Sequence, residues 1–163
     1  MGLCLVLVLC FAQCLSALAF EVDEFKSGQS RQQVKALLAN WKFDAIEDLS
    51  GDTTIASDKL EKGTNRIFKF FFCSDKLVTF EQSMKASAKN FITVAGNYIN
   101  TYGQPARVSA GSNVISTGEK NSVSMAWRAK NDFVGVRYLI NPNGEDLFVI
   151  YETPNNCWQV PRR

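Results

Sequence analysis

The side chains of this sequence that are best suited to chemistry are its cysteines and carboxylates, because the chain contains no histidine. Without an imidazole, triads of the Ser-His-Asp or Cys-His type are excluded, and so are the usual histidine zinc sites. No serine stands three residues before a lysine, and the sequence has neither a P-loop nor a G-x-G-x-x-G segment. We therefore predict that the protein is not an enzyme and that it has no metal site and no cofactor.

Paired carboxylates are the one catalytic alternative, because glycoside hydrolysis needs only two acids flanking the bond that is cleaved. Glu81 and Glu152 differ from the other acids, since each ends an apolar, strand-like run. At both positions we expect an edge charge that discourages strand addition. The other candidates, which we interpret as solvated loop charges, are Glu47, Asp48, Asp52, Asp58, Asp132, Glu145 and Asp146.

Residues 1–19, MGLCLVLVLCFAQCLSALA, have the pattern of a signal peptide. A mostly apolar run is closed by Ala17-Leu18-Ala19, which is an A-x-A cleavage pattern, and acidic residues begin at Glu21. The run is shorter than the ~20 residues that span a bilayer, which disfavours an uncleaved anchor. We predict an exported protein, periplasmic or secreted, with no stable membrane insertion after cleavage.

Cleavage would leave two of the five cysteines, Cys73 and Cys157. In an oxidising compartment these two cysteines are expected to form a disulfide. Such a bond would close a loop of about 85 residues, for which the chain-entropy treatment gives roughly 4 to 5 kcal/mol of stabilisation. A reactive or metal-binding thiol is disfavoured, because no histidine and no nearby second cysteine would support it.

Composition places the chain in the ordinary globular class. It has 163 residues, of which 46% are hydrophobic and 21% are charged. Its formal net charge of +2 is too close to neutral to indicate nucleic acid or an anionic membrane as a partner. We expect residues 20–163 to form a single compact domain, and the sequence does not indicate its oligomeric state.

The most apolar stretch after residue 19 is 66–80, RIFKFFFCSDKLVTF, which predicts a β-hairpin at the centre of a sheet. Ser74-Asp75-Lys76 is its only polar break. Because side chains alternate along a strand, two faces are expected. They are Phe68, Phe70 and Phe72 on one side, and Lys69, Phe71 and Cys73 on the other.

Two amphipathic helices are predicted to cover this hairpin. The first spans 31–41, with Ser30 as N-cap and Gln33 completing a capping box. Its apolar stripe consists of Val34, Leu37, Leu38 and Trp41. The second helix spans 85–102 and ends at Gly103 and Pro105.

The remaining segments predict loops and antiparallel strands. Residues 44–65 are polar and are expected to be mostly loop, with a brief strand at 53–56. Residues 108–120 predict one edge strand and a loose connection, and a meander follows over 122–128, 133–140 and 147–153. The fold class is therefore α+β, with two helices packed on one side of an antiparallel sheet or sheets. The halves 25–84 and 85–153 each have a helix followed by strands, and whether they form a tandem repeat stays open.

A family resemblance covers about residues 25–84. Residues 25–38, FKSGQSRQQVKALL, fit the pattern F-x-x-G-x-[ST]-x-x-x-V-x-x-L-L and so resemble the opening of the BamE/SmpA-like small envelope proteins. Asp75-Lys76-Leu77 is similar to the strand-turn-strand segment of that family. The resemblance implies a β-lactamase-inhibitor-protein-like fold, in which a helix or helical hairpin packs on an antiparallel sheet. It also implies a non-catalytic envelope module that binds protein.

Aromatic residues supply the candidate contact points. Trp41 with Phe43, and Trp158 near the C-terminus, are candidate anchors for a partner, although packing is the simpler interpretation. Our leading hypothesis is an exported, non-catalytic module that binds or inhibits another extracytoplasmic protein. The first alternative is a carrier of a small apolar ligand in a cavity lined by Phe68, Phe70 and Phe71, for which a filled core is the simpler interpretation. The second alternative is a hydrolase that acts through paired acids.

Overall fold

The computed structural model describes residues 20–49, 51–58 and 66–157. In chain order, its elements are β1 (Glu21–Val22), β2 (Phe25–Lys26), α1 (Arg31–Trp41), β3 (Ala45–Leu49), β4 (Thr53–Ser57), β5 (Ile67–Cys73), β6 (Lys76–Met84), α2 (Ala88–Tyr102), β7 (Arg107–Ile115), β8 (Gly118–Ala129), β9 (Asp132–Asn141) and β10 (Gly144–Glu152).

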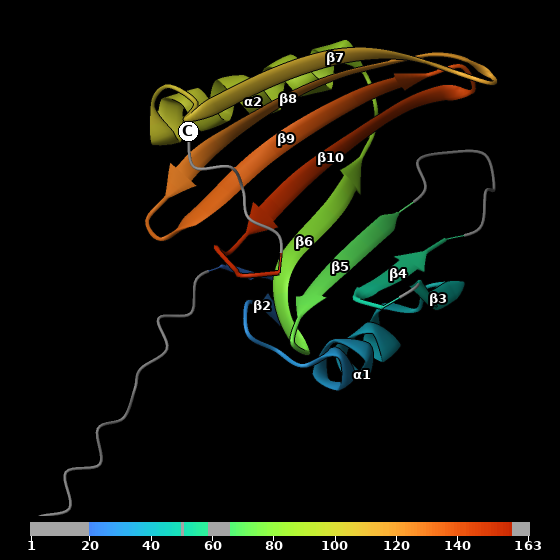
Figure 1. The fold of residues 1–163 in the computed structure, drawn as a ribbon. Helices are drawn as coiled ribbons and strands as arrows, with labels where there is room; N and C mark the ends of the chain where they lie inside the picture. Colours follow the sequence, from blue (N-terminus) through green and yellow to red (C-terminus); the bar gives the residue numbers. More distant parts are fainter. Residues whose placement is uncertain (1–19, 50, 59–65, 158–163) are drawn as a thin grey trace, which may run out of the picture.

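Eight of the strands form one antiparallel sheet in the order β3-β4-β5-β6-β10-β9-β8-β7, and β1 and β2 form a separate hairpin (Figure 1). The order shows two halves of the same pattern. α1 precedes the meander β3 to β6, α2 precedes the meander β7 to β10, and the halves join where β6 pairs with β10. The α+β class with two helices on an antiparallel sheet is therefore confirmed.

Both helices begin at side-chain caps. The Ser30 hydroxyl accepts a hydrogen bond from the Gln33 N–H, and the Gln33 side chain accepts one from the Ser30 N–H, which is the predicted capping box. The second helix begins at Ala88 rather than Lys85, because the Ser87 hydroxyl accepts the Asn90 N–H at 3.1 Å and so fixes the first turn.

Two segments contain more strand than the sequence predicts. Residues 44–65 were expected to be mostly loop, but they contain β3 and β4, which pair in series onto β5. Residues 108–120 were expected to contain a loose connection, but β7 runs to Ile115 and β8 already begins at Gly118. In each case a polar sequence forms a strand because a neighbouring strand satisfies its backbone groups, an effect that side-chain pattern does not reveal.

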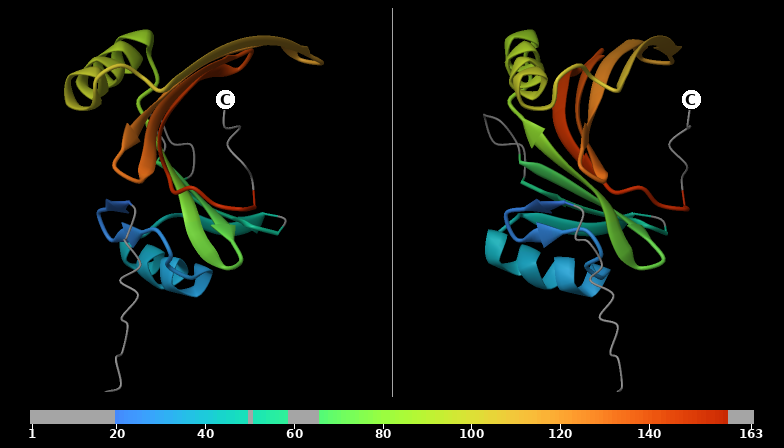
Figure 2. Two further views of the ribbon diagram at one scale, coloured as in Figure 1. Left: turned by 60° about the vertical axis from the view of Figure 1, so that its left-hand side comes forward. Right: turned by 90° about the vertical axis from the view of Figure 1, so that its left-hand side faces the viewer.

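The apolar core lies on one face of the sheet in two clusters. The first, under α1, is built from Phe25, Val34, Leu38 and the buried phenylalanines of β5 and β6. The second, under α2, is built around Trp127, Val136 and Tyr138. Tyr151 of β10 packs against both clusters. Figure 2 shows the consequence: both helices lie on the outer side of a strongly bent sheet, and its inner, concave side carries neither helix.

The predicted hairpin faces are confirmed. Phe68, Phe70 and Phe72 are buried against α1, and the intervening side chains face the concave side. The turn is tighter than expected, because Lys76 already belongs to β6 and the two residues Ser74 and Asp75 both have positive φ, 49° and 59°.

A disulfide joins the tip of this hairpin to the segment that follows the last strand. Cys73 and Cys157, separated by 84 residues in sequence, form the predicted bond with Cα atoms 5.6 Å apart. The chain after β10 is therefore tied back across the concave side of the sheet. None of the described helices is long and apolar enough to cross a membrane.

Candidate functional site

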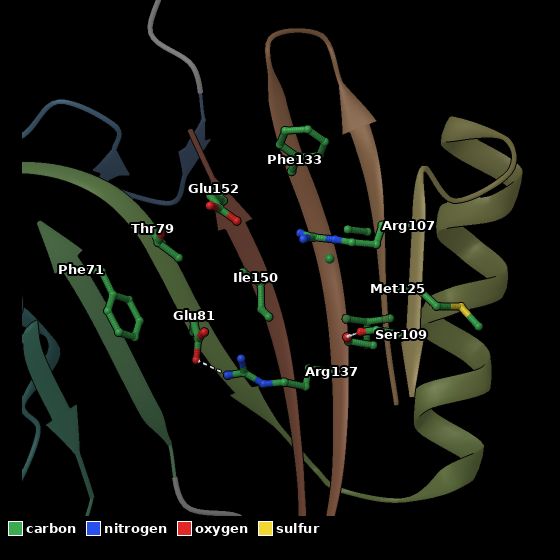
Figure 3. A pocket seen from close by; sticks show the side chains of 14 residues that line it. Phe71, Thr79, Glu81, Arg107, Ser109, Met125, Phe133, Arg137, Ile150 and Glu152 are labelled. Atoms are coloured by element: carbon green, nitrogen blue, oxygen red, sulfur yellow. Dashed lines mark hydrogen bonds and ion pairs between the residues drawn. The ribbon is translucent and has the colours of Figure 1, made fainter. Parts of the chain in front are cut away.

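A cavity of about 470 Å³ lies on the concave face, where the two halves of the sheet meet (Figure 3). We call it the seam cavity. Its lining residues come from β5 and β6 of the first half and from all four strands of the second half. It therefore exists only because β6 and β10 pair and bring the halves together.

The seam cavity is open above its floor because the residues of the floor have small side chains. Gly135 of β9 stands directly opposite Ala126 of β8, and Ser124 follows two residues away on the same face. A Cβ atom on Gly135 would lie 3.1 Å from the Met125 carbonyl oxygen, a tight approach that favours glycine there. The strand pairing thus leaves an open space above this floor, and larger side chains surround it.

One wall of the seam cavity is an ion pair between strands that are not neighbours. Arg137 of β9 donates from Nη2 to Oε2 of Glu81 on β6 at 2.6 Å, across the intervening strand β10. Glu81 is only 5% exposed, so this contact offsets part of the cost of burying its charge. The Arg137 Nε is also buried, and among the described residues it has no hydrogen-bond partner.

This placement corrects the prediction for the two strand-ending acids. Glu81 and Glu152 do not lie at an edge, because β6 and β10 are the two central strands of the sheet and each is paired on both sides. Both carboxylates instead line the seam cavity. A charge within an apolar strand here marks an internal polar site rather than protection of an edge.

Glu152 and Arg107 approach the cavity from opposite sides (Figure 3). Burial raises the pKa of the Glu152 carboxyl, the charge of Arg107 partly offsets this, and the nearby Glu81 adds to it. Within the part of the chain that the structure describes, the side chains of Glu152 and Arg107 make no hydrogen bond and no ion pair shorter than 4.0 Å. The site therefore presents an acceptor and a donor with space between them.

Thr79 adds a further polar group. It stands directly opposite Glu152 on the neighbouring strand and is 6% exposed. Its Oγ1 is buried without a hydrogen-bond partner among the described residues, and it lines the cavity. A buried hydroxyl of this kind is costly unless something binds it, so Thr79 supports a site that receives a ligand group.

Two aromatic rings flank these polar groups. Phe71 stands opposite Thr79 on one side, and Phe133 stands opposite Glu152 on the other. The guanidinium of Arg128 lies 5.5 Å from the centre of the Phe133 ring. Across one cavity the sheet therefore presents aromatic, anionic and cationic side chains in adjacent rows.

The other predicted site residues lie elsewhere. Trp41 packs on Phe25 and Phe68 with ring centres 5.8 and 5.3 Å apart, and its Nε1 donates to Glu24. Phe43 packs on Phe68 at 5.0 Å. Both are partly buried against the first core cluster, on the face opposite the seam cavity. Trp158 lies outside the described residues.

Of the three rings expected to line an apolar cavity, only Phe71 lines the seam cavity, while Phe68 and Phe70 are core residues. Sequence reasoning missed Arg107, Phe133 and Arg137. Arg137 carried a usable signal, because it is the one charged residue in the apolar run 133–140, as Glu81 is in 77–81. Arg107 carried no such signal, since its place in the cavity lining depends on the bend of the sheet that brings the edge strand β7 to the cavity.

Comparison with known proteins gives no relative. No family model matches the chain, and no curated protein and no solved structure matches it. The likeness of residues 25–84 to the BamE/SmpA-like proteins stays a prediction. What can be stated is the class that the fold defines: an α+β protein of two helix-plus-meander halves, whose polar cavity lies at their junction.

Among the described residues, no group of three or more cysteine, aspartate or glutamate side chains is placed to hold a metal ion. The side chains that line the seam cavity are aromatic, anionic, cationic and small polar groups.

Proposed function

We propose that this chain is an exported, non-catalytic protein that binds a segment of another extracytoplasmic protein on the concave face of its sheet. The observation that carries the proposal is the seam cavity, a site on the helix-free face that both halves build together. Aromatic and arginine side chains are the groups most enriched at the centres of protein interfaces, and this cavity is lined by both.

A polypeptide segment fits the polar groups of the cavity better than an apolar ligand does. A peptide unit or a polar side chain can donate to Glu152 and accept from Arg107, while Phe71 and Phe133 cover apolar atoms. A wholly apolar ligand would bury the same carboxylate and guanidinium without compensating hydrogen bonds, which is unfavourable. The apolar-carrier hypothesis therefore has weaker support than protein binding.

Support for export comes from the disulfide. A bond between Cys73 and Cys157 is consistent with an oxidising, extracytoplasmic location, since such bonds are rare in reducing compartments.

The test is a selection of displayed random peptides on the purified chain, followed by calorimetric titration of the enriched peptides. In the variant A126L, the longer side chain fills the floor of the cavity beside Gly135. The matched control A39L makes the same change at an exposed position of α1. We expect A126L to abolish binding and A39L to leave it unchanged. Peptides that bind A126L as tightly as the unmodified chain would overturn the proposal.

A second candidate function rests on one observation: the two strand-ending acids share a cavity, and the pKa of one of them is raised by burial. Acid-pair hydrolysis uses one acid with a raised pKa and a second, ionised carboxylate. Assays on a panel of glycans and peptidoglycan would test it. Turnover that E152Q abolishes, in a chain on which no displayed peptide is enriched, would favour hydrolysis over protein binding.

A further inference from the structure

The two edges of the sheet differ in how they are protected against pairing with another strand. β3 has only five residues, and two of them, Glu47 and Asp48, are acidic. β7 has nine residues, RVSAGSNVI, and every one of them is exposed. It contains no proline and no lysine, and its single charge, Arg107, stands at one end. Long, neutral edges of this kind pair readily with a further strand, and proteins usually disrupt them.

We propose that β7 pairs with β7 of a second copy of this chain, antiparallel and centred on Gly111, so that the two sheets become one. Arg107 and Ser109 of β7 also line the seam cavity, but this pairing uses the free backbone edge of β7 and does not depend on the proposed function.

Backbone geometry restricts how two copies of β7 can pair. Along a strand, residues that use their N–H and C=O toward one neighbour alternate with residues that use them toward the other. β8 already binds one set of these residues. Two copies of β7 can therefore pair only if each residue whose N–H and C=O point away from β8 faces another residue of that kind. The symmetry axis must then pass through a residue rather than between two, and centring it on Gly111 pairs all nine residues of the strand.

The side chains favour this register over its neighbours. Val108 is 56% exposed and Val114 is 88% exposed, and the pairing places each opposite the other on the helix side of the joined sheet. Moving the centre to Ala110 or Ser112 would leave Val114 opposite an alanine instead. The remaining pairs bring no two like charges together: Arg107 with Ile115, Ser109 with Asn113, Ala110 with Ser112, and Gly111 with itself.

A shallow hollow of about 480 Å³ beside β7 extends the surface that a second copy would cover. It is lined by Ala110 and Ser112 of β7 and, further in, by Val123, Tyr138 and Ile140. The second copy would bring its own Ala110 and Ser112 to the border of this hollow. Pairing along one strand gives an interface at the small end of the known range, so the dimer should dissociate on dilution.

Sedimentation velocity on the purified chain, expressed with residues 1–19 in an exporting host, tests the proposal. Over concentrations of about 1 µM to 1 mM, the range expected for a small interface, we expect a monomer-dimer equilibrium. V108K and V114E should each weaken it by about tenfold or more, since each loses the apolar pair. The double variant V108K/V114E should recover the dimer, because the register then places opposite charges across the interface twice.

I92K is the matched control, because Ile92 is a β-branched residue that is 67% exposed and belongs to α2 instead of β7. It should leave the dimer unchanged. Three results would each overturn the proposal: a monomer throughout, an effect of I92K equal to that of V108K, or no recovery in the double variant.

Amide hydrogen exchange of the unmodified chain supplies a measurement that needs no substitution. Protection of 107–115 should rise with protein concentration, while protection of β3 stays constant. Exchange in β7 that is independent of concentration would also overturn the proposal. Protection that appears only when an added peptide is present would assign this edge to another protein instead of a second copy.

Discussion

The ion pair between Glu81 and Arg137 yields a prediction whose size follows from burial. Replacing Arg137 by methionine would leave the Glu81 carboxylate, whose side chain is 7% exposed, without its partner. Removing one member of a buried pair costs about 3 to 5 kcal/mol. We expect the lower end, about 3 kcal/mol, because the Arg137 side chain is 32% exposed and water can enter where it stood.

The double variant E81Q/R137M removes both charges and should cost much less, about 1 kcal/mol or below, because no unpaired buried charge remains. Urea unfolding at pH 7 of the parent chain, R137M, E81Q and the double variant would complete a double-mutant cycle.

Two outcomes of this cycle would refute the dependence of Glu81 on Arg137. If R137M cost less than about 1 kcal/mol, or if E81Q/R137M cost as much as R137M, then Glu81 would not depend on Arg137 for its burial. The charged wall of the seam cavity would then be an accessible surface pair, of the kind that contributes little to stability.

Three further predictions concern stability and use urea unfolding. C73A/C157A should lower the free energy of unfolding by up to about 4 to 5 kcal/mol, the loop-entropy value for an 84-residue separation, and a loss below ~1 kcal/mol would contradict it. G135A should cost about 1 to 2 kcal/mol, because its Cβ would press on a carbonyl oxygen 3.1 Å away. G111A meets nothing closer than 3.6 Å and is the near-neutral control, so equal losses would show that the close approach does not matter. E152Q tests the raised pKa of Glu152: burial disfavours its charge, so the parent chain should lose stability relative to E152Q as the pH rises above 4.5, and a constant difference from pH 4 to 7 would refute this.

Local sequence signals predicted the elements whose stabilisation is also local. Ser30 caps α1 through a side chain three residues away, and the alternation of residues 66–80 separates a core face from a cavity face. The disulfide was predictable as well, because only two cysteines lie beyond residue 19. In each case the deciding interaction, or the choice of partner, can be read from the sequence without knowing the strand order.

The parts that could not be predicted depend on strand order. β3 and β4 are polar and form strands because β5 gives them a template. Glu81 was interpreted as an edge charge, yet its partner Arg137 is 56 residues away and reaches it across β10. Alternation shows on which face a side chain lies, but not which strands will stand beside it.

The pairing of β6 with β10 connects the fold to the site. Each half has its own helix and four strands, but the first contributes Phe71, Thr79 and Glu81 to the seam cavity, while the second contributes Arg107 and Glu152 among others. The two core clusters also meet at the pairing of β6 with β10. Tyr151 stacks on Phe80 with ring centres 6.1 Å apart and also packs against the second cluster.

Neither half alone would therefore present the site. Separating them would expose the inner edges of β6 and β10 together with the apolar residues that meet beneath them. Because the pairing that completes the sheet also brings the opposing charges into one cavity, folding and assembly of the seam cavity are the same event. A variant that weakens the β6 to β10 contact should thus lose stability and peptide binding together, whereas A126L should lose only binding.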